Sequence, residues 1–528
     1  MKQWWLGRYR DAVRKLARRW RRRSSLQIPL YVHIAFWLIV GLLVATGVLC
    51  ILWQSYGRPK LASLPAGGVE PRTLFDAAKV ALTVVAGLGG VVALVVAYRR
   101  QGLNEAEHKR EDAKLFTERF VKASELLGSE KAAIRLAGVY AMASLADDWP
   151  HGRQTCIDVL CAYIRMPQRL TEKHARYGRP AGAGSKPERL ETDTDSDVAT
   201  DYIGEARYNP REERQVRETV TRVIVDHLHE DAPTNWFGHV FDFTGATFED
   251  LDFGGADFTN CQLVFDDCIF YGETNFSGSY FYKCKLSFLS AIYAGRMSFE
   301  VAHFEDCDIN LHGDLTGEGE ITFYASKIVS GEIDLTTPRG VGGLSFIGTE
   351  IEGGTISLFN LDFAQDGTSA SFGMSRSMLK GGTFRFLGGN FAGGTMYFNG
   401  LTVAGGDLII GSDPTYGPTP EHARKRFRTN LSGAKFSFWG ARIEAGAIRF
   451  IDAELDGSEV NFEAIEMSGG EISFPGSSFR SGSLVFSADS EITGGVVSFG
   501  EAEQHGANLQ LEGLRPEMGV RVVPFDQP

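Results

Sequence analysis

Cysteine is scarce in this chain, which has only seven among 528 residues. The number is odd and Cys50 lies inside a long apolar run, so the sequence argues against a disulfide framework and suits a cytoplasmic protein. Familiar enzyme motifs are also missing, since the chain has no P-loop, nucleophile elbow, HExxH motif or paired CxxC. We therefore expect a non-enzymatic protein without a metal or cofactor.

Glycine and phenylalanine are abundant instead. The 61 glycines are about 12% of the chain, against a typical value of roughly 7%, and both they and the 36 phenylalanines concentrate after residue 236. A hydrophobic content of 43% excludes a disordered chain. The net charge of −12 is uneven, because residues 1–23 contain ten bases and one acid whereas the C-terminal half is acidic. The two ends should therefore meet different partners.

Two long apolar runs predict membrane spans. Residues 28–53 contain no Asp, Glu, Lys or Arg, and residues 77–98 contain only Lys79. Both runs are long enough to cross a hydrocarbon core of about 30 Å. The first is longer than the apolar part of a signal peptide and no clear cleavage site follows it. Small residues at four-residue spacing would let the spans pack on each other or on another copy of the chain.

Basic residues beside these runs predict their orientation. The arm 1–27 is strongly basic, the loop 54–76 has few bases, and two arginines follow the second span, so both termini should be cytoplasmic. We expect a multi-pass inner-membrane protein whose basic arm contacts the anionic inner leaflet, and a nucleic-acid-binding arm is the weaker alternative. The candidate membrane-surface residues are Arg18, Arg19, Arg21, Arg22, Arg23, Arg99 and Arg100.

The region after the spans predicts a small helical bundle. Apolar residues recur at helical spacing from 103 to 166, and Gly128 and Pro150 end two of the helices. The stretch 167–210 is polar and rich in Gly, Pro, Asp and Thr, which is typical of a flexible linker. An amphipathic helix over 211–235 would cover the first open edge of the β-structure that follows.

The C-terminal half begins with a five-residue period. Large apolar residues are evenly spaced there, and Ala or Cys stands two positions before three of them. They are Phe243, Phe248, Phe253, Phe258 and Leu263. This segment resembles the pentapeptide-repeat family, and the two-span start resembles its membrane-anchored bacterial members. The resemblance implies a right-handed, four-sided parallel β-helix in which each five-residue step forms one side.

The period then lengthens to eleven or twelve residues, each unit combining a five-residue and a seven-residue step. A twelve-residue coil is too tight to hold two Phe, so we expect two units per turn of 23 or 24 residues. About ten such turns, at roughly 4.8 Å each, would form a rod near 50 Å long. The side-chain stacks expected from this period are Cys261–Cys284–Cys307, Phe450–Phe474–Phe499 and Phe462–Phe486.

These features predict a multidomain chain: a two-helix transmembrane hairpin, a small α-helical region and a C-terminal right-handed parallel β-helix of pentapeptide-repeat type. Its segments are a basic cytoplasmic arm (1–27), a first span (28–53), an extracytoplasmic loop (54–76), a second span (77–98), a helical region (99–166), a linker (167–210), a capping helix (211–235), the β-helix (236–515) and a tail (516–528).

A basic cluster interrupts the repeat between Ile410 and Phe438. A tolerated surface loop is the simpler explanation. The functional alternative is a docking loop for an acidic partner, the inner leaflet or nucleic acid. The candidate docking residues are His422, Arg424, Lys425, Arg426 and Arg428.

Two other groups keep different chemistries open. Four cysteines and two histidines resemble metal ligands, although cysteines stacked in a core are usually small hydrophobic residues. A set of acids suggests a polysaccharide-cleaving β-helix, although a solvated acidic face explains it more simply. The residues are Cys261, Cys268, Cys284, Cys307, His303 and His312 in the first group, and Asp266, Asp267, Glu305, Asp306 and Asp308 in the second.

The leading functional hypothesis is a non-enzymatic, membrane-anchored scaffold that presents an acidic β-helix to a protein partner in the cytoplasm. The family resemblance implies one alternative, a nucleic-acid mimic that acts on a DNA-binding enzyme such as DNA gyrase. A β-helix hydrolase is the third class. The sequence does not favour nucleic acid as a partner, and it leaves open a homo-oligomer formed through the spans or through an end of the β-helix.

Overall fold

The computed structural model describes single residues between 39 and 54, residues 71–167, and residues 210–525 except for 317–318, 337–342, 362–370, 392 and 412–428. The chain divides into two compact units, Met1–Leu115 and Phe116–Pro528. The expected first span at 28–53 and the expected linker at 167–210 lie almost wholly outside the described residues.

A single long helix, α3 (Pro71–Leu127), contains the second expected span and the first helix of the expected bundle. No proline follows Pro71 within it, so nothing in the sequence forces a break. Gly128 comes directly after its last residue, as predicted, and the Gly128 N–H donates to the Ser124 carbonyl at 3.0 Å. Within the described part of the chain, no helix is both long and apolar enough to cross a bilayer.

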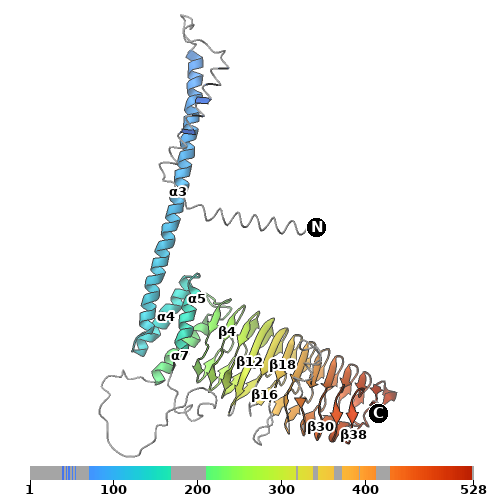
Figure 1. Cartoon of the computed structure of the whole chain (residues 1–528). Helices are drawn as coiled ribbons and strands as arrows, with labels where there is room; N and C mark the ends of the chain where they lie inside the picture. Colours follow the sequence, from blue (N-terminus) through green and yellow to red (C-terminus); the bar gives the residue numbers. More distant parts are fainter. Residues whose placement is uncertain are drawn as a thin grey trace, which may run out of the picture. The chain divides into compact units, whose positions relative to one another are not determined.

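Three further helices cover the start of the β-structure (Figure 1). They are α4 (Ala132–Asp148), α5 (Arg153–Arg165) and α7 (Pro210–Asp226). Trp236 is fully buried beneath them, its indole N–H donates to Asp147 Oδ1 at 2.9 Å, and its ring stacks on His227 with centroids 4.2 Å apart. Aromatic burial and a satisfied polar atom therefore fix the junction between the helices and the first turn.

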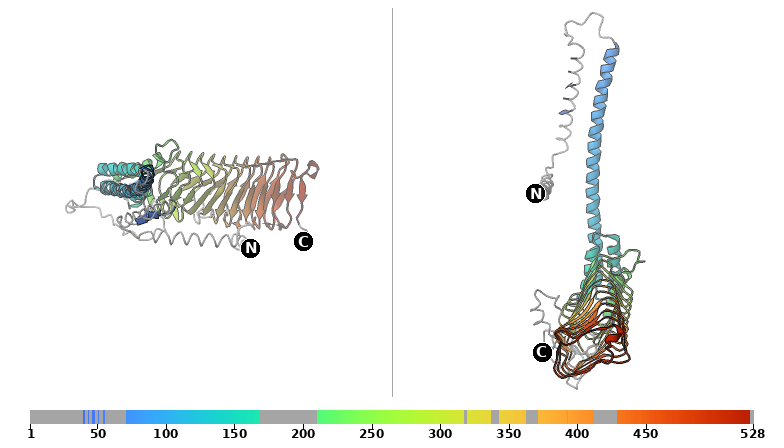
Figure 2. Two further views of the ribbon diagram at one scale, coloured as in Figure 1. Left: turned by 90° about the horizontal axis from the view of Figure 1, so that it is seen from above. Right: turned by 90° about the vertical axis from the view of Figure 1, so that its right-hand side faces the viewer.

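The rest of the chain is a parallel β-solenoid of about ten turns (Figures 1 and 2). Among the described residues, its longest sheet has 15 strands, twelve of which are hydrogen-bonded one to the next in a single path from turn to turn. These twelve are β1 (Val240–Asp242), β4 (Gln262–Val264), β8 (Lys285–Ser287), β12 (Cys307–Leu315), β15 (Gly331–Thr336), β18 (Thr355–Phe359), β21 (Thr383–Leu387), β25 (Asp407–Gly411), β29 (Ala447–Ile451), β32 (Glu471–Ser473), β36 (Val496–Ser498) and β39 (Arg521–Val523).

Two further long sheets complete most of each turn, with 11 and 9 described strands. The 11-stranded sheet consists of β3 (Leu251–Asp252), β6 (Thr274–Asn275), β10 (Arg296–Ser298), β13 (Glu320–Thr322), β16 (Gly343–Ser345), β19 (Ser371–Gly373), β23 (Thr395–Tyr397), β27 (Lys435–Ser437), β30 (Ser458–Phe462), β34 (Gly482–Phe486) and β38 (Asn508–Gln510). The 9-stranded sheet consists of β7 (Tyr280–Tyr282), β11 (His303–Glu305), β14 (Lys327–Ile328), β17 (Glu350–Ile351), β20 (Met378–Leu379), β24 (Thr402–Val403), β28 (Arg442–Ile443), β31 (Glu466–Met467) and β35 (Glu491–Ile492).

The fourth side of the solenoid is short and discontinuous. Its strands are β2 (Thr247–Phe248), β5 (Ile269–Phe270), β9 (Ala291–Tyr293), β22 (Gly389–Asn390), β26 (Thr429–Asn430), β33 (Ser478–Phe479) and β37 (Glu503–Gln504). In the sequence, the undescribed segments 337–342 and 362–370 fall between a strand of the 15-stranded sheet and one of the 11-stranded sheet, and 412–428 falls between β25 and β26. Turns therefore differ in length while the strands of the three long sheets stay in register.

The predicted period sets the geometry of the turn. In the first turn the five inward residues at five-residue spacing are all buried, and successive ones lie on successive sides. Further along, Lys285 pairs with Asp308 and Asp308 with Glu332, which gives turns of 23 and 24 residues. The four-sided turn with two units per coil is thus confirmed.

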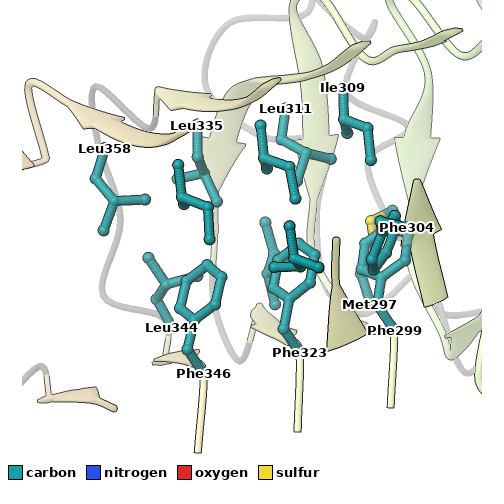
Figure 3. Close-up of a cluster of buried hydrophobic side chains, with 14 of the residues drawn as sticks. Met297, Phe299, Phe304, Ile309, Leu311, Phe323, Leu335, Leu344, Phe346 and Leu358 are labelled. Atoms are coloured by element: carbon teal, nitrogen blue, oxygen red, sulfur yellow. The ribbon is translucent and has the colours of Figure 1, made fainter. Parts of the chain in front are cut away.

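Ring stacks form the core of the solenoid, as predicted. Phe474 lies between Phe450 and Phe499, with ring centroids 5.2 and 5.4 Å away. Phe486 stacks on Phe462 at 4.7 Å, in a separate column. Figure 3 shows the same arrangement earlier in the chain, where Phe, Leu, Ile and Met side chains fill the interior. Each buried large side chain contributes about 1.5–3 kcal/mol, and neighbouring turns supply most of its contacts.

The two ends of the solenoid are covered differently. At the first turn, the Gln154 side chain of α5 bonds the open edge of β1, accepting from Val240 N–H at 3.0 Å and donating to its carbonyl at 2.7 Å. At the other end, residues expected to form a tail outside the β-helix instead supply β39, and Phe525 stacks on Phe499 at 4.7 Å. Hydrogen bonding therefore covers the first edge, whereas an aromatic ring covers the last core position.

Candidate interaction surfaces

Few of the predicted site residues fall in the described part of the chain. Most of them lie outside it. These are the basic-arm residues Arg18, Arg19, Arg21, Arg22 and Arg23, the side chain of Arg99, and the cluster His422, Arg424, Lys425, Arg426 and Arg428. Arg100 is exposed on α3. These membrane and docking assignments stay predictions, so the candidate surfaces that can be built from contacts are the outer faces of the three long sheets.

The outer face of the 15-stranded sheet carries acids that an arginine bridges. Arg449 on β29 lies between β25 and β32. Its guanidinium contacts Asp407 Oδ2 at 3.0 Å on one side and Glu471 Oε2 at 3.4 Å on the other. Asp407 and Glu471 both pair in register with Ala447, two residues before Arg449, so the long arginine side chain reaches each neighbouring strand diagonally.

One carboxylate on this face is partly shielded from solvent. Asp334 on β15 has a buried Oδ1 with no hydrogen-bond partner in the described structure. Burial, reinforced by the negative charge of Glu332, raises the pKa of Asp334 to about 6. His312 on the neighbouring strand also has a buried, unpartnered Nε2, and burial lowers its pKa. Both of these atoms are closed to solvent, although the two residues are only partly buried.

The outer face of the 9-stranded sheet is a ladder of exposed ion pairs. Glu352 contacts Lys327 Nζ at 3.1 Å and Lys380 Nζ at 3.4 Å, and Arg442 bonds Glu466 at 2.7 Å. The hydrogen bond from Lys327 lowers the pKa of Glu352. Because these pairs are exposed and screened by water, each contributes little to stability. They give this face a fixed pattern of charged positions, interrupted by the uncharged Met378 and Thr402 between Glu350 and Arg442.

The outer face of the 11-stranded sheet has an uncharged middle. Arg296 and Glu320 on adjacent strands form one charged end, and Lys435 and Glu459 form the other. The outward positions between them belong to strands β16, β19 and β23 and carry no charge. Depletion of charge in the centre with charged flanks is the usual composition of a protein interface.

Exposed aromatic residues flank this uncharged middle. Tyr324 is 50% exposed, Tyr397 42% and Trp439 58%, and Ile347 lies among them half-buried. We call these four residues, with Gly373, the neutral patch, and the exposed Arg376 lies at the same corner, directly after Ser375. Sequence reasoning missed it, because its members face outward beside the conspicuous inward Phe column. The available signal was the aromatic residue that directly follows an inward Phe in "TFYAS" and "SFWGA".

A groove of about 500 Å³ lies between α7 and the first two turns. Acids from the turns line one wall, and Arg214 of α7 contacts Asp250 at 2.7 Å and Glu218 at 2.7 Å. The buried Arg217 donates to the carbonyls of Ile164, Met166 (3.1 Å) and Thr247 (3.4 Å). Arg217 thus satisfies both the C-terminus of α5 and an open strand edge, which gives the groove's buried cation a structural role.

The cysteines stack as the 23-residue spacing predicts. Cys284 Sγ and Cys307 Sγ are 3.4 Å apart in adjacent turns, and Cys261 is buried one turn earlier. The contact with Cys307 and burial raise the pKa of the Cys284 thiol. Over the residues described, no group of three or more His, Cys, Asp or Glu side chains is placed to hold a metal ion. The cysteines act as small core residues at a corner of the coil.

Neither a scan against protein-family models, nor a search of curated proteins, nor a search of solved structures finds a match to this chain.

Proposed function

We propose that the protein is a non-enzymatic, membrane-anchored interaction scaffold whose solenoid presents fixed side-chain patterns to a protein partner in the cytoplasm. The supporting observation is the set of three long sheets in register around one continuous core. A stacked core of this kind is rigid, so outward side chains repeat at about 4.8 Å and form a long binding surface. The proposal includes the right-handed, pentapeptide-type coil, which the five-residue steps of the first turn favour.

Membrane anchoring belongs to the same proposal. Helix α3 carries exposed large apolar side chains within the stretch 77–98, among them Leu94 (74%) and Tyr98 (78%). Such residues are costly in water and favour a lipid environment. The basic arm and the arginines that follow this stretch favour cytoplasmic termini.

Proximity labelling tests the scaffold. The full chain, fused at its C-terminus to a labelling enzyme, should enrich a small set of membrane-associated proteins over the free enzyme. A variant with the 9-stranded ladder reversed by Lys380→Glu and Arg442→Glu should lose some of them, whereas Arg449→Glu on the 15-stranded sheet serves as the matched reversal. Equal labelling by all forms and the free enzyme would contradict a scaffold.

Fractionation tests the anchor separately. The full chain should sediment with membranes and resist extraction by high salt, because apolar burial is insensitive to screening. A form lacking residues 28–98 should move to the soluble fraction. Recovery of the full chain in the soluble fraction would disprove membrane anchoring and would leave the scaffold proposal unaffected.

A further inference from the structure

We propose that Cys284 and Cys307 form a modification site, at which hydrogen peroxide joins the two thiols as a reversible disulfide between successive turns. The odd number of cysteines gives no sign of a permanent disulfide framework. Disulfides inside the cell are usually transient and redox-sensing instead. The supporting features are the contact between the two sulfur atoms, the backbone bond that holds their turns together, and their place just beneath the surface.

The backbone sets the two cysteines opposite each other. Lys285 pairs in register with Asp308, so Cys284 and Cys307, the residues directly before them, are opposite as well. The Asp308 N–H donates to the Cys284 carbonyl at 3.0 Å, which ties the two turns together at this corner. Neighbouring strands lie about 4.8 Å apart, within the range of roughly 4.4–6.8 Å that a disulfide usually spans between Cα atoms.

The two sulfur atoms already touch. Cys284 Sγ lies 3.4 Å from Cys307 Sγ, and a disulfide is about 2.05 Å long, so the atoms need to approach by only about 1.4 Å. Cys261, one turn earlier in the same stack, instead directs its thiol to the Thr259 carbonyl at 3.5 Å. Within the described part of the chain, no other two cysteine sulfurs form a hydrogen-bonding contact.

Both thiols lie one side chain beneath the surface. Cys284 is 1% exposed and Cys307 is 3% exposed, so a bulky redox protein does not reach either sulfur. Hydrogen peroxide is close to water in size, and small opening motions of the corner are enough to admit it. Each cysteine has exposed charged neighbours on both sides in the chain, namely Lys283 and Lys285, and Asp306 and Asp308.

The oxidation proceeds in two steps. One thiol reacts as its thiolate, whose sulfur attacks a peroxide oxygen to form a sulfenic acid and release hydroxide. The second sulfur then attacks the sulfenic sulfur, the disulfide forms, and the oxygen leaves as water. Overall the two thiols lose two electrons and two protons, and the peroxide becomes two molecules of water. The carbonyls of Phe281 and Glu305 accept from the Cys307 thiol at 3.2 and 3.3 Å, so thiolate is scarce and the first step is slow.

The disulfide should be easy to reduce. Side chains that are in register on parallel strands have Cβ atoms about 4.8 Å apart, slightly farther than the roughly 3.5–4.5 Å of an ordinary disulfide. Strain of this kind makes a disulfide more reducible. We therefore expect a small thiol such as mercaptoethanol to return the site to two free cysteines.

The bond would staple the solenoid where its corners change from cysteine to glycine. Cys307 is the last corner cysteine, and it pairs in register with Gly331 of the next turn. A bond across the 23 residues from Cys284 to Cys307 restricts the opening of this turn. The Asp308 amide, which donates to the Cys284 carbonyl, should therefore exchange with deuterium more slowly in the oxidised protein.

Mass spectrometry of the full chain in mild detergent tests the site, in a Cys50→Ser background that prevents cross-links between chains. After peroxide treatment the peptides that contain Cys284 and Cys307 should be joined, and alkylation of the unfolded protein should label two fewer thiols. Mercaptoethanol should restore both. Exchange of the Asp308 amide should slow by about tenfold on oxidation and recover on reduction.

Alanine variants separate this pair from the rest of the stack. Cys284→Ala and Cys307→Ala should each abolish the bond and the slower exchange. Cys261→Ala, at the same corner one turn earlier, is the matched control and should keep both effects. Circular dichroism checks that all three variants are folded.

The exposed Met166 serves as an internal clock, because peroxide converts exposed methionine to its sulfoxide. Treatment that oxidises Met166 but leaves Cys284 and Cys307 free would overturn the proposal. A bond from Cys284 to Cys261, or a sulfinic acid on either cysteine of the pair without a bond, would overturn it as well.

Discussion

One corner of the solenoid is built differently in its first turns and in its later turns. Between the 9-stranded and 15-stranded sheets, the first turns place Cys261, Cys284 and Cys307 at the inner corner, and later turns place glycine at the same register position. Before Cys307, Asp306 has the positive φ of 56°. In the later turns the positive φ falls one residue further on, as in Gly354 with φ of 79°.

This one-residue shift explains the change of composition. Where the positive φ precedes the corner residue, its Cβ points into the core and a small side chain such as Cys fits. At Gly354, a Cβ would lie 2.5 Å from the Gly331 carbonyl oxygen of the previous turn. Only glycine is compatible with both the left-handed backbone and this close approach. The glycine excess of the chain therefore reflects a local backbone choice.

The largest expected effect comes from adding a side chain to a glycine corner. Gly354→Ala combines backbone strain with a clash against the previous turn, so the free energy of unfolding should fall by about 3 kcal/mol. Gly245→Ala is the control, because Gly245 also has a positive φ, of 74°, but open space around its Cβ. It should cost about 1 kcal/mol in urea denaturation. Equal losses in the two variants would contradict the account given for glycine corners.

The reverse exchange should be milder. Cys284→Gly removes a buried side chain and adds freedom to the unfolded chain, for a loss of about 2 kcal/mol in the free energy of unfolding. Cys284→Ala keeps the Cβ and should lose about 1 kcal/mol. Thermal unfolding of the pair would separate the two contributions. If the glycine variant were as stable as wild type, cysteine and glycine corners would be interchangeable after all.

The pH dependence of stability tests a difference on the outer face. Asp334 lies in the first glycine-cornered turn, next to Asn310 in the last cysteine-cornered turn. The pKa of Asp334 is raised from 3.8 to about 6, so the folded state favours the protonated carboxyl. Stability should therefore fall as pH rises from about 4 to about 6, by about 1 kcal/mol once partial exposure is allowed for.

Replacing the Asp334 carboxyl by an amide, as in Asn310 of the neighbouring turn, should remove this dependence of stability on pH. Asp334→Asn should be more stable than wild type at pH 7 and nearly equal to it at pH 4, as measured by thermal midpoints. Asp308→Asn, an exposed acid on the adjacent strand, is the matched control. If Asp334→Asn kept the pH dependence of wild-type stability, Asp334 would be excluded as the cause of that dependence.

The smallest effect is expected on the exposed ion-pair ladder. Arg442→Ala removes the contact with Glu466 in the later turns, and both side chains are more than half exposed. The loss in the free energy of unfolding should be smaller than that of Cys284→Ala and should shrink further in high salt. A loss comparable to that of Gly354→Ala would show that surface charge, rather than the corner, sets stability in this part.

Much of the fold could be predicted from the residues. The Phe474 and Phe462 stacks, the cysteine stack and the four-sided turn follow from periods visible in one sequence, because inward positions must be apolar in every turn. The interaction surfaces were largely hidden. Tyr397 and Trp439 lie on adjacent turns, yet the insertion 412–428 separates them in the chain, and outward positions have no shared chemistry that marks a period.

The amino-acid order thus determined which side chains enter the core and how many residues complete a turn, since burial of large apolar groups repeats regularly along the chain. The folded coil decided which outward residues become neighbours. Segments of different length between the strands leave the strand register unchanged, so Arg296, Glu320, Lys435 and Glu459 fall into one column. Hydrogen bonds between successive turns place these four residues in one column, and no short stretch of the sequence predicts that placement.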